Sequence, residues 1–218
     1  MKPTVHIVRH GQSLHNVERG YPHRDPPLTA AGQEATKRIK IPCTPDLIII
    51  SPMTRTIQTA TNMFPAIFTT VPFPVTVQIW PDLRETYEAE CNKGLSLAAI
   101  STKFPSLDFA DCPAEWDYPP HTVAGANARA ESVRRRLKEV SEVYRNIVVI
   151  THRGFIEFLV RGSRFDVCET RSYRFGRRDG REDAEAGISG EAQEGFEYGP
   201  TVLVPVGILE PGGESAVS

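Results

Sequence analysis

Two histidines follow short apolar runs, and each has an arginine and a glycine beside it. His10 lies in Arg9-His10-Gly11 after the run 5–8, and His152 lies in His152-Arg153-Gly154 after the run 147–150. A neutral imidazole is a good nucleophile near pH 7, and guanidinium groups bind phosphate oxygens through charge-assisted, often bidentate hydrogen bonds. The pattern therefore predicts chemistry on phosphorus, with His10 as the attacking group and His152 as a hydrogen-bond donor to a phosphate oxygen.

Two more polar residues complete this chemistry. Arg55 comes shortly after the apolar run 47–50 and could supply a second guanidinium, while Glu85 follows the run 75–79. An alcohol leaving group needs a proton, and Glu85 is the candidate general acid. Glycines let the backbone approach an anion closely. The residues expected to bind or approach the phosphate are Arg9, Gly11, Asn16, Arg55, Arg153 and Gly154.

The elements that must position these residues can be read from the apolar runs. The runs 5–8, 47–50 and 147–150 are rich in β-branched and aliphatic residues and are typical of buried parallel strands. Strand and helix alternate, which favours an α/β fold with a mostly parallel sheet. Ligands bind at the carboxyl ends of such strands, so the histidines and arginines are expected at one rim. Helices are predicted at 30–39, 54–64 and 124–144, and further strands at 75–79, 172–175 and 201–206.

Composition limits the class of protein. The 218 residues suit a single domain, which we place at 1–206. Lys and Arg number 25 against 27 Asp and Glu, so there is no overall basic field for nucleic acid. The four cysteines have no close pairing, which argues against a zinc cage or a disulfide framework. Neither a signal peptide nor a membrane-spanning run is apparent, so we expect a cytoplasmic protein without nucleic-acid or membrane partners.

Other segments have simpler interpretations. Residues 108–121 contain three prolines and predict a long surface excursion, residues 177–195 a mobile loop, and residues 207–218 a flexible tail. His6 is expected to pack or hydrogen-bond within the sheet, and the arginine run 134–136 to be the solvated face of a helix. The histidines that could line a pocket entrance are His15, His23 and His121.

These motifs together resemble those of the histidine phosphatase superfamily, also called phosphoglycerate mutase-like. Arg9-His10-Gly11 with Asn16 resembles its signature, and Leu83-Arg84-Glu85 resembles its acid-donor motif. The resemblance runs in order from about residue 4 to residue 176. The remaining matching segments are 25–32, which leads into the first helix, 51–60, which carries the second arginine, and 151–154, which carries the second histidine.

The resemblance implies a three-layer α/β/α sandwich and a phosphohistidine intermediate on His10. Phosphate would be held by Arg9, Arg55 and His152, with Glu85 as the proton donor. It implies no metal or other cofactor, and a small phosphorylated molecule as substrate. The overall sequence pattern, including residues 169–173, resembles that of the fungal branch of small phosphatases.

Two alternatives remain beside a phosphatase. The glycolytic mutases carry further basic residues after the acid-donor motif, whereas residues 86–90 are acidic here, which disfavours a mutase. The fold could also serve as a binding module or in a biosynthetic reaction without phosphate transfer. Arg153 replaces a glycine that the family commonly has, so we predict that Arg153→Gly changes substrate preference.

Overall fold

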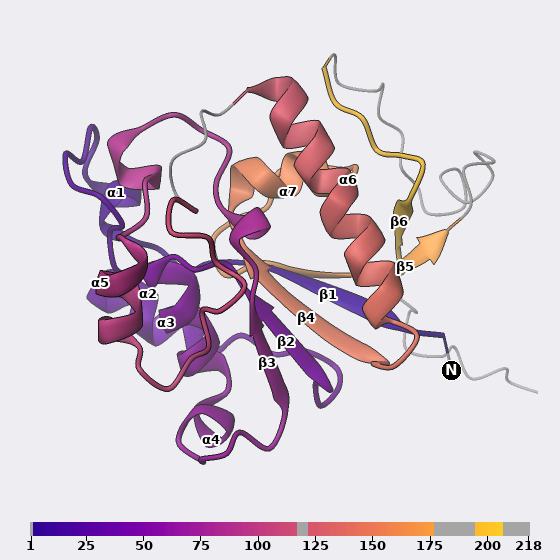
Figure 1. Ribbon diagram of the computed structural model, residues 1–218, viewed down its shortest axis with the longest axis horizontal. Helices are drawn as coiled ribbons and strands as arrows, with labels where there is room; N and C mark the ends of the chain where they lie inside the picture. The colour runs from indigo at the N-terminus through magenta and orange to yellow at the C-terminus, as the bar shows by residue number, and fades with distance from the viewer. Residues whose placement is uncertain (1, 117–121, 177–194, 207–218) are drawn as a thin grey trace, which may run out of the picture.

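The structure is a computed structural model that describes residues 2–116, 122–176 and 195–206. One sheet in this part of the chain has the strand order β3-β2-β4-β1-β5-β6 (Figure 1). The strands are β1 (Thr4–Arg9), β2 (Leu47–Ile50), β3 (Thr76–Ile79), β4 (Asn146–Thr151), β5 (Thr170–Gly176) and β6 (Val202–Pro205).

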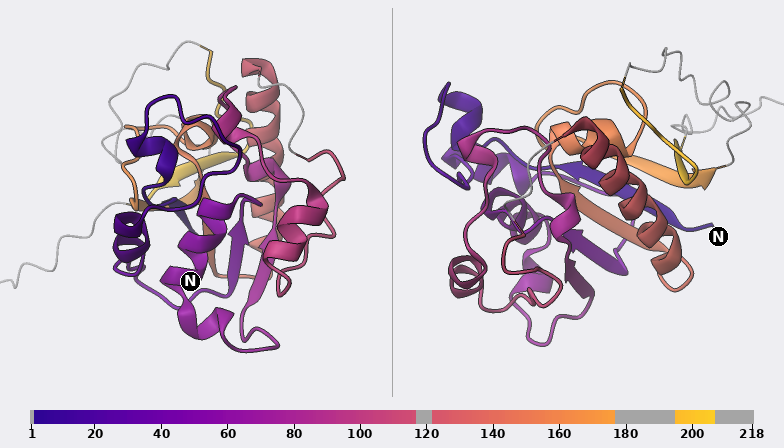
Figure 2. Two further views of the ribbon diagram at one scale, coloured as in Figure 1. Left: turned by 90° about the vertical axis from the view of Figure 1, so that its left-hand side faces the viewer. Right: turned by 45° about the horizontal axis from the view of Figure 1, so that its top comes forward.

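The central strands are parallel, as the continuous apolar runs predicted. β4 pairs in parallel with both β1 and β2, and β2 pairs in parallel with β3. β5 and β6 add antiparallel strands, and Figure 2 shows them at one side of the sheet. Arg9 is opposite Thr151 in the β1–β4 register. His10 and His152 are the next residues of the two strands, so the register alone places them next to each other.

Helices cover both faces of the sheet and complete the sandwich. Residues Val5 and Ile7 of β1 pack with α6 (Val123–Val140) and α7 (Arg153–Leu159). Val8 points to the other face and packs with α3 (Thr54–Met63) and α5 (Leu97–Lys103). Alternate residues of one strand thus enter opposite cores, as the pleat requires. The shorter helices are α1 (Leu14–Val17), α2 (Ala30–Thr36), α4 (Pro65–Phe68), and the 3-10 turns η1 (Pro81–Leu83) and η2 (Glu90–Asn92).

The segment after α5 agrees with the prediction only in part. Phe109, Cys112 and Trp116 are buried in the core that also contains residues of α3 and α5, while the residues between them are exposed. Residues 108–116 therefore run along the surface and are held there by three buried apolar side chains. Residues 117–121, together with most of the predicted loop (177–194) and the predicted tail, lie outside the described residues.

The expectation for the arginine run was wrong for Arg134. Its side chain is fully buried, and Nη1 donates to the carbonyl oxygens of Phe158 at 2.8 Å and Leu159 at 3.2 Å. These carbonyls belong to the end of α7, where helical partners run out. Glu131 neutralises the guanidinium at 2.9 Å. Arg134 therefore joins α6 to α7 instead of facing solvent.

Helix length and hydropathy bear on membrane insertion. No helix in the described parts of the chain is both long enough and apolar enough to cross a bilayer.

Candidate active site

The two histidines meet at the carboxyl edge of the sheet. In Figure 1, β1 runs from the N-terminus toward the side where α1 lies, and β4 runs with it. The ring centroids of His10 and His152 are 5.1 Å apart, and both residues are buried. Two side chains separated by 141 intervening residues therefore share one small site.

One hydrogen bond sets the tautomer of His10. Its Nδ1 lies 2.7 Å from the carbonyl oxygen of Gly11. A carbonyl oxygen only accepts, so Nδ1 carries the hydrogen and Nε2 keeps its lone pair. Burial, followed by the charge of Arg55, lowers the pKa of His10 well below its usual value. The result is a neutral imidazole whose Nε2 is a nucleophile.

Arg55 is held at the start of α3 by an anchored helix end. The carboxylate of Asp25 accepts from the backbone N–H of Thr54 at 2.8 Å and from its hydroxyl at 2.5 Å. The Arg55 guanidinium is fully buried and donates to the side chain of Asn92 at 3.1 Å and to the carbonyl of Cys91 at 3.2 Å. Its charge, after burial, lowers the pKa of both His10 and His152.

Several buried donors at this edge have no acceptor among the described residues. They are Nε of Arg9, Nε of Arg55 and Nδ1 of His152. Arg9 uses Nη1 for the carbonyl of Phe165 at 2.7 Å, and His152 Nε2 lies 2.9 Å from the hydroxyl of Ser51. A buried donor without an acceptor is costly, on the order of 1–3 kcal/mol. Donors of this kind grouped together are suited to an anion that brings several acceptors at once.

Glu85 lies against the start of α7, the helix that follows His152. Its Oε1 accepts from the backbone N–H of Thr86 at 2.8 Å, and its Oε2 accepts from that of Gly154 at 3.3 Å. A Cβ on residue 154 would overlap the Glu85 carboxylate. Gly154 therefore leaves room for the Glu85 carboxylate. Its close approach to an anion stays a prediction.

Gly11 is also constrained by protein packing. A Cβ there would overlap the Thr36 side chain of α2. The backbone N–H of Gly11 donates to the hydroxyl of Thr59 at 3.1 Å. The close approach at Gly11 is thus to α2 and α3, which fixes the turn that carries His10.

Most of the expected residues line one pocket of about 480 Å³, whereas Gly11, Arg55 and His152 are not among its lining residues. Asn16 lines it and also caps α1, because its side-chain oxygen accepts from the backbone N–H of Ser13 at 3.0 Å. His15 also lines the pocket, 5.9 Å from His10, and burial lowers its pKa to about 3. The predicted site residues that line this pocket are Arg9, His10, Asn16, Glu85, Arg153 and Gly154.

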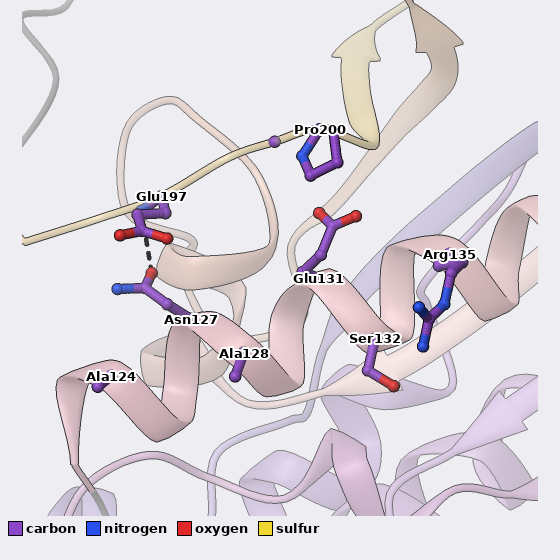
Figure 3. Close-up of a pocket in the computed structure, with 9 residues that line it drawn as sticks. Ala124, Asn127, Ala128, Glu131, Ser132, Arg135, Glu197 and Pro200 are labelled. Atoms are coloured by element: carbon purple, nitrogen blue, oxygen red, sulfur yellow. Dashed lines mark hydrogen bonds between the residues drawn. The ribbon is translucent and has the colours of Figure 1, made fainter.

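A second hollow of about 520 Å³ lies between α6 and residues 197–200 (Figure 3). Its charged lining residues are Glu131, Glu197 and Arg135. Glu131 already pairs with Arg134, and none of the predicted site residues lines this hollow. The prediction of a phosphate site therefore concerns the pocket at the strand ends.

Arg129 contacts the segment that carries Glu85 and was not singled out from the sequence. From α6 its Nη1 donates to the carbonyls of Asp82 at 3.1 Å and Arg84 at 2.7 Å, and its Nη2 to that of Glu85 at 3.4 Å. The guanidinium also lies 4.6 Å from the ring centroid of Phe155, and burial lowers its pKa to about 9. Its acceptors are backbone atoms distant in sequence, so no local motif marks it.

The fold and the site together define a class. In a mostly parallel sheet ligands bind at the carboxyl ends of the strands, and the histidines and arginines found there are residue types that bind phosphate groups. The sequence model of the histidine phosphatase superfamily (branch 1) matches residues 5–174. The chain belongs to this superfamily.

Individual relatives agree with this assignment. The chain is 30% identical over 118 residues to a probable phosphatase of Schizosaccharomyces pombe, and the match covers 50% of this chain and 53% of that protein. The chain thus spans about half the length of that curated relative.

Solved structures share the fold. An ecdysone phosphate phosphatase from Bombyx mori has a TM-score of 0.61 at 16% identity, covering 79% of this chain and 89% of that chain. An alpha-ribazole phosphatase from Shigella flexneri has a TM-score of 0.55 at 19% identity, covering 80% and 91%. Identities this low show the shared phosphoglycerate mutase-like fold alone.

Proposed function

We propose that this protein is a phosphatase that hydrolyses a small-molecule phosphate monoester through a phosphohistidine on His10. The observation that carries the proposal is the group of buried donors without acceptors around a neutral imidazole. Arg9, Arg55 and His152 each contribute one such donor at the same strand edge as His10 Nε2. A phosphoryl group would supply oxygens to these donors and phosphorus to the nucleophile.

In the first step His10 Nε2 attacks phosphorus. A P–N bond forms while the P–O bond to the alcohol breaks, and the Glu85 carboxyl gives its proton to the departing oxygen. Arg9 and Arg55 stabilise the charge that spreads over the phosphoryl oxygens. His152 donates from Nδ1, since Nε2 can accept from the Ser51 hydroxyl.

In the second step water attacks the phosphohistidine. Glu85, now ionised, accepts a proton from the water, the P–N bond breaks, and inorganic phosphate leaves. The neutral His10 and the protonated Glu85 are restored. The one carboxyl thus serves first as acid and then as base.

Hydrolysis of p-nitrophenyl phosphate tests the proposal. Wild-type protein should release inorganic phosphate, and His10→Ala should lower kcat by at least about 10³-fold because the nucleophile is lost. His23→Ala is the matched control, since His23 is exposed and does not line the pocket.

The variants must first be shown to be folded by circular dichroism. Equal rates for wild type and a folded His10→Ala would contradict the proposal. Isomer interconversion without net release of inorganic phosphate would indicate a mutase instead.

A further inference from the structure

Arg153 has an unusual place at the pocket. It is the first residue of α7 and directly follows His152, yet it is exposed while His152 is fully buried. It lines the same pocket as Arg9 and His10. Arg153 is therefore at the rim, next to the proposed phosphate position but outside it.

Within the described residues, no hydrogen bond or ion pair engages the Arg153 guanidinium. Glu157 lies one turn further along α7 and would be its natural partner. That carboxylate instead pairs with Nε of Arg164 at 2.9 Å. Arg153 is therefore a cation of the pocket with which no carboxylate among the described residues forms an ion pair.

The charge of Arg153 affects the pKa of neighbouring groups. Arg153 lowers the pKa of Arg9, second to the effect of burial, and it also contributes to the lowered pKa of His15. The effect on Arg9 is repulsion between two cations, which Glu85 and Asp166 oppose by raising the pKa of Arg9. His15 is neutral at pH 7, so its lowered pKa shows only that the pocket disfavours a further positive charge. Additional negative charge at the rim would relieve this repulsion, beyond what the transferred phosphoryl group brings to Arg9 and Arg55.

The pocket has room for such a group. Its volume of about 480 Å³ lies in the range of pockets that hold whole metabolites, which is more than a phosphate needs. Tyr87, with 74% of its surface exposed, lines the same pocket. The part of a substrate beyond the phosphate would therefore extend along the rim that carries Arg153.

We propose that the substrate carries a second anionic group, a carboxylate or a second phosphoryl group, on its leaving alcohol, and that Arg153 binds it. This inference rests on the proposed phosphatase function. A guanidinium presents paired N–H donors that match both carboxylate and phosphate oxygens. Arg153 is thus a specificity-determining residue that selects substrates with two anionic groups.

Two matched substrate pairs test the inference. 3-Phosphoglycerate differs from glycerol 3-phosphate by a carboxylate in place of a hydroxymethyl group, and fructose 1,6-bisphosphate differs from fructose 6-phosphate by a phosphoryl group. For wild-type protein, kcat/KM measured by release of inorganic phosphate should be about 10- to 100-fold higher for the compound with the second anionic group in at least one pair. These compounds are 3-phosphoglycerate and fructose 1,6-bisphosphate. Arg153→Gln should reduce that ratio to near one.

Arg135→Gln is the control, because Arg135 is exposed on α6 and lies in the other hollow; it should keep the wild-type ratio. p-Nitrophenyl phosphate is measured with every variant and reports on the phosphate site itself. No preference in either pair for wild type, or an unchanged ratio in Arg153→Gln, would overturn the inference. If one of these two results is found while His10→Ala is inactive, only the inference about Arg153 fails and the phosphatase proposal is unaffected. Hydrolysis by His10→Ala at the wild-type rate would contradict the phosphatase proposal itself.

Discussion

At the scale of single residues, the proposed roles of His10 as nucleophile and Glu85 as general acid follow from the hydrogen bonds that each side chain makes. The Gly11 carbonyl fixes the His10 hydrogen on Nδ1 and leaves Nε2 for attack. The Glu85 carboxylate accepts hydrogen bonds from the backbone N–H groups of Thr86 and Gly154 and from the Thr86 hydroxyl. Among the described residues, no lysine or arginine forms an ion pair with it. A carboxyl without an ion-pair partner can exchange a proton with substrate and water.

The role of Glu85 predicts a dependence on the leaving group. Glu85→Gln cannot donate the proton, so kcat for glycerol 3-phosphate should fall by about 10²- to 10⁴-fold. p-Nitrophenolate needs little protonation to leave, so the first step with p-nitrophenyl phosphate should be affected much less. Single-turnover measurement of alcohol release with both substrates checks this. An equal loss of that rate for both would show that Glu85 acts in some other way.

The residue types at this site could be predicted from sequence because they follow strand ends directly. His10 and His152 are each the first residue after a buried strand. The need for a glycine at position 154 could not be predicted in the same way. A Cβ there would overlap the carboxylate of Glu85, which is distant in sequence. Asn92 and Asp25 were missed as partners for the same reason: they act on Arg55 and Thr54 across the fold.

At the scale of elements, α6 supports the acid as well as the core. Arg129 donates to the carbonyl oxygens of Asp82, Arg84 and Glu85, and its guanidinium lies over Phe155 of α7. One side chain therefore ties the acid-bearing segment to the helix after His152. We infer that Arg129 is a positioning residue for Glu85.

Loss of this contact should misplace the acid without changing phosphate binding. Arg129→Met is expected to lower kcat for glycerol 3-phosphate by about 10- to 100-fold while KM stays within about twofold. The rate of p-nitrophenol release should change less, and Arg129→Lys should recover part of the loss by donating to one carbonyl. A purely structural role would instead lower both rates equally, in step with the melting temperature.

The strands were easier to predict than the packing of the helices. Buried parallel strands have continuous apolar runs, so β1, β2 and β4 were found almost to the residue, while α6 ends at Val140 and not at Tyr144. The burial of Arg134 had a sequence signal, because Val133, Arg134 and Leu137 share one helical face. An arginine is normally expected to face solvent, and only the structure shows that carbonyl oxygens of α7 accept hydrogen bonds from Arg134.

At the scale of the whole molecule, burial of neutral imidazoles links stability to pH. Burial is the main cause that lowers the pKa of His10 and of His152 well below 6.5, so both stay neutral in the folded chain. In the unfolded chain they take up protons as the pH falls below 6.5. The unfolded state then binds more protons, and folding stability is lost on acidification from that pH downward.

The size of this effect can be measured by urea unfolding. His10, His152 and His15, whose pKa burial lowers to about 3, should together lower the free energy of unfolding by about 3 kcal/mol between pH 6.5 and 5.5. His10→Asn removes one of the three and should reduce the decrease by about a third. A wild-type free energy that does not change over this interval would contradict the buried neutral state of these rings.

The central claim is that His10 accepts the phosphoryl group. Rapid quenching of the protein with a radiolabelled phosphate monoester in alkali, followed by peptide mapping, tests it most directly. The predicted result is an alkali-stable, acid-labile label on His10 that is absent in His10→Ala. A folded, active protein that carries no such label during turnover, or a label on another residue, would contradict it.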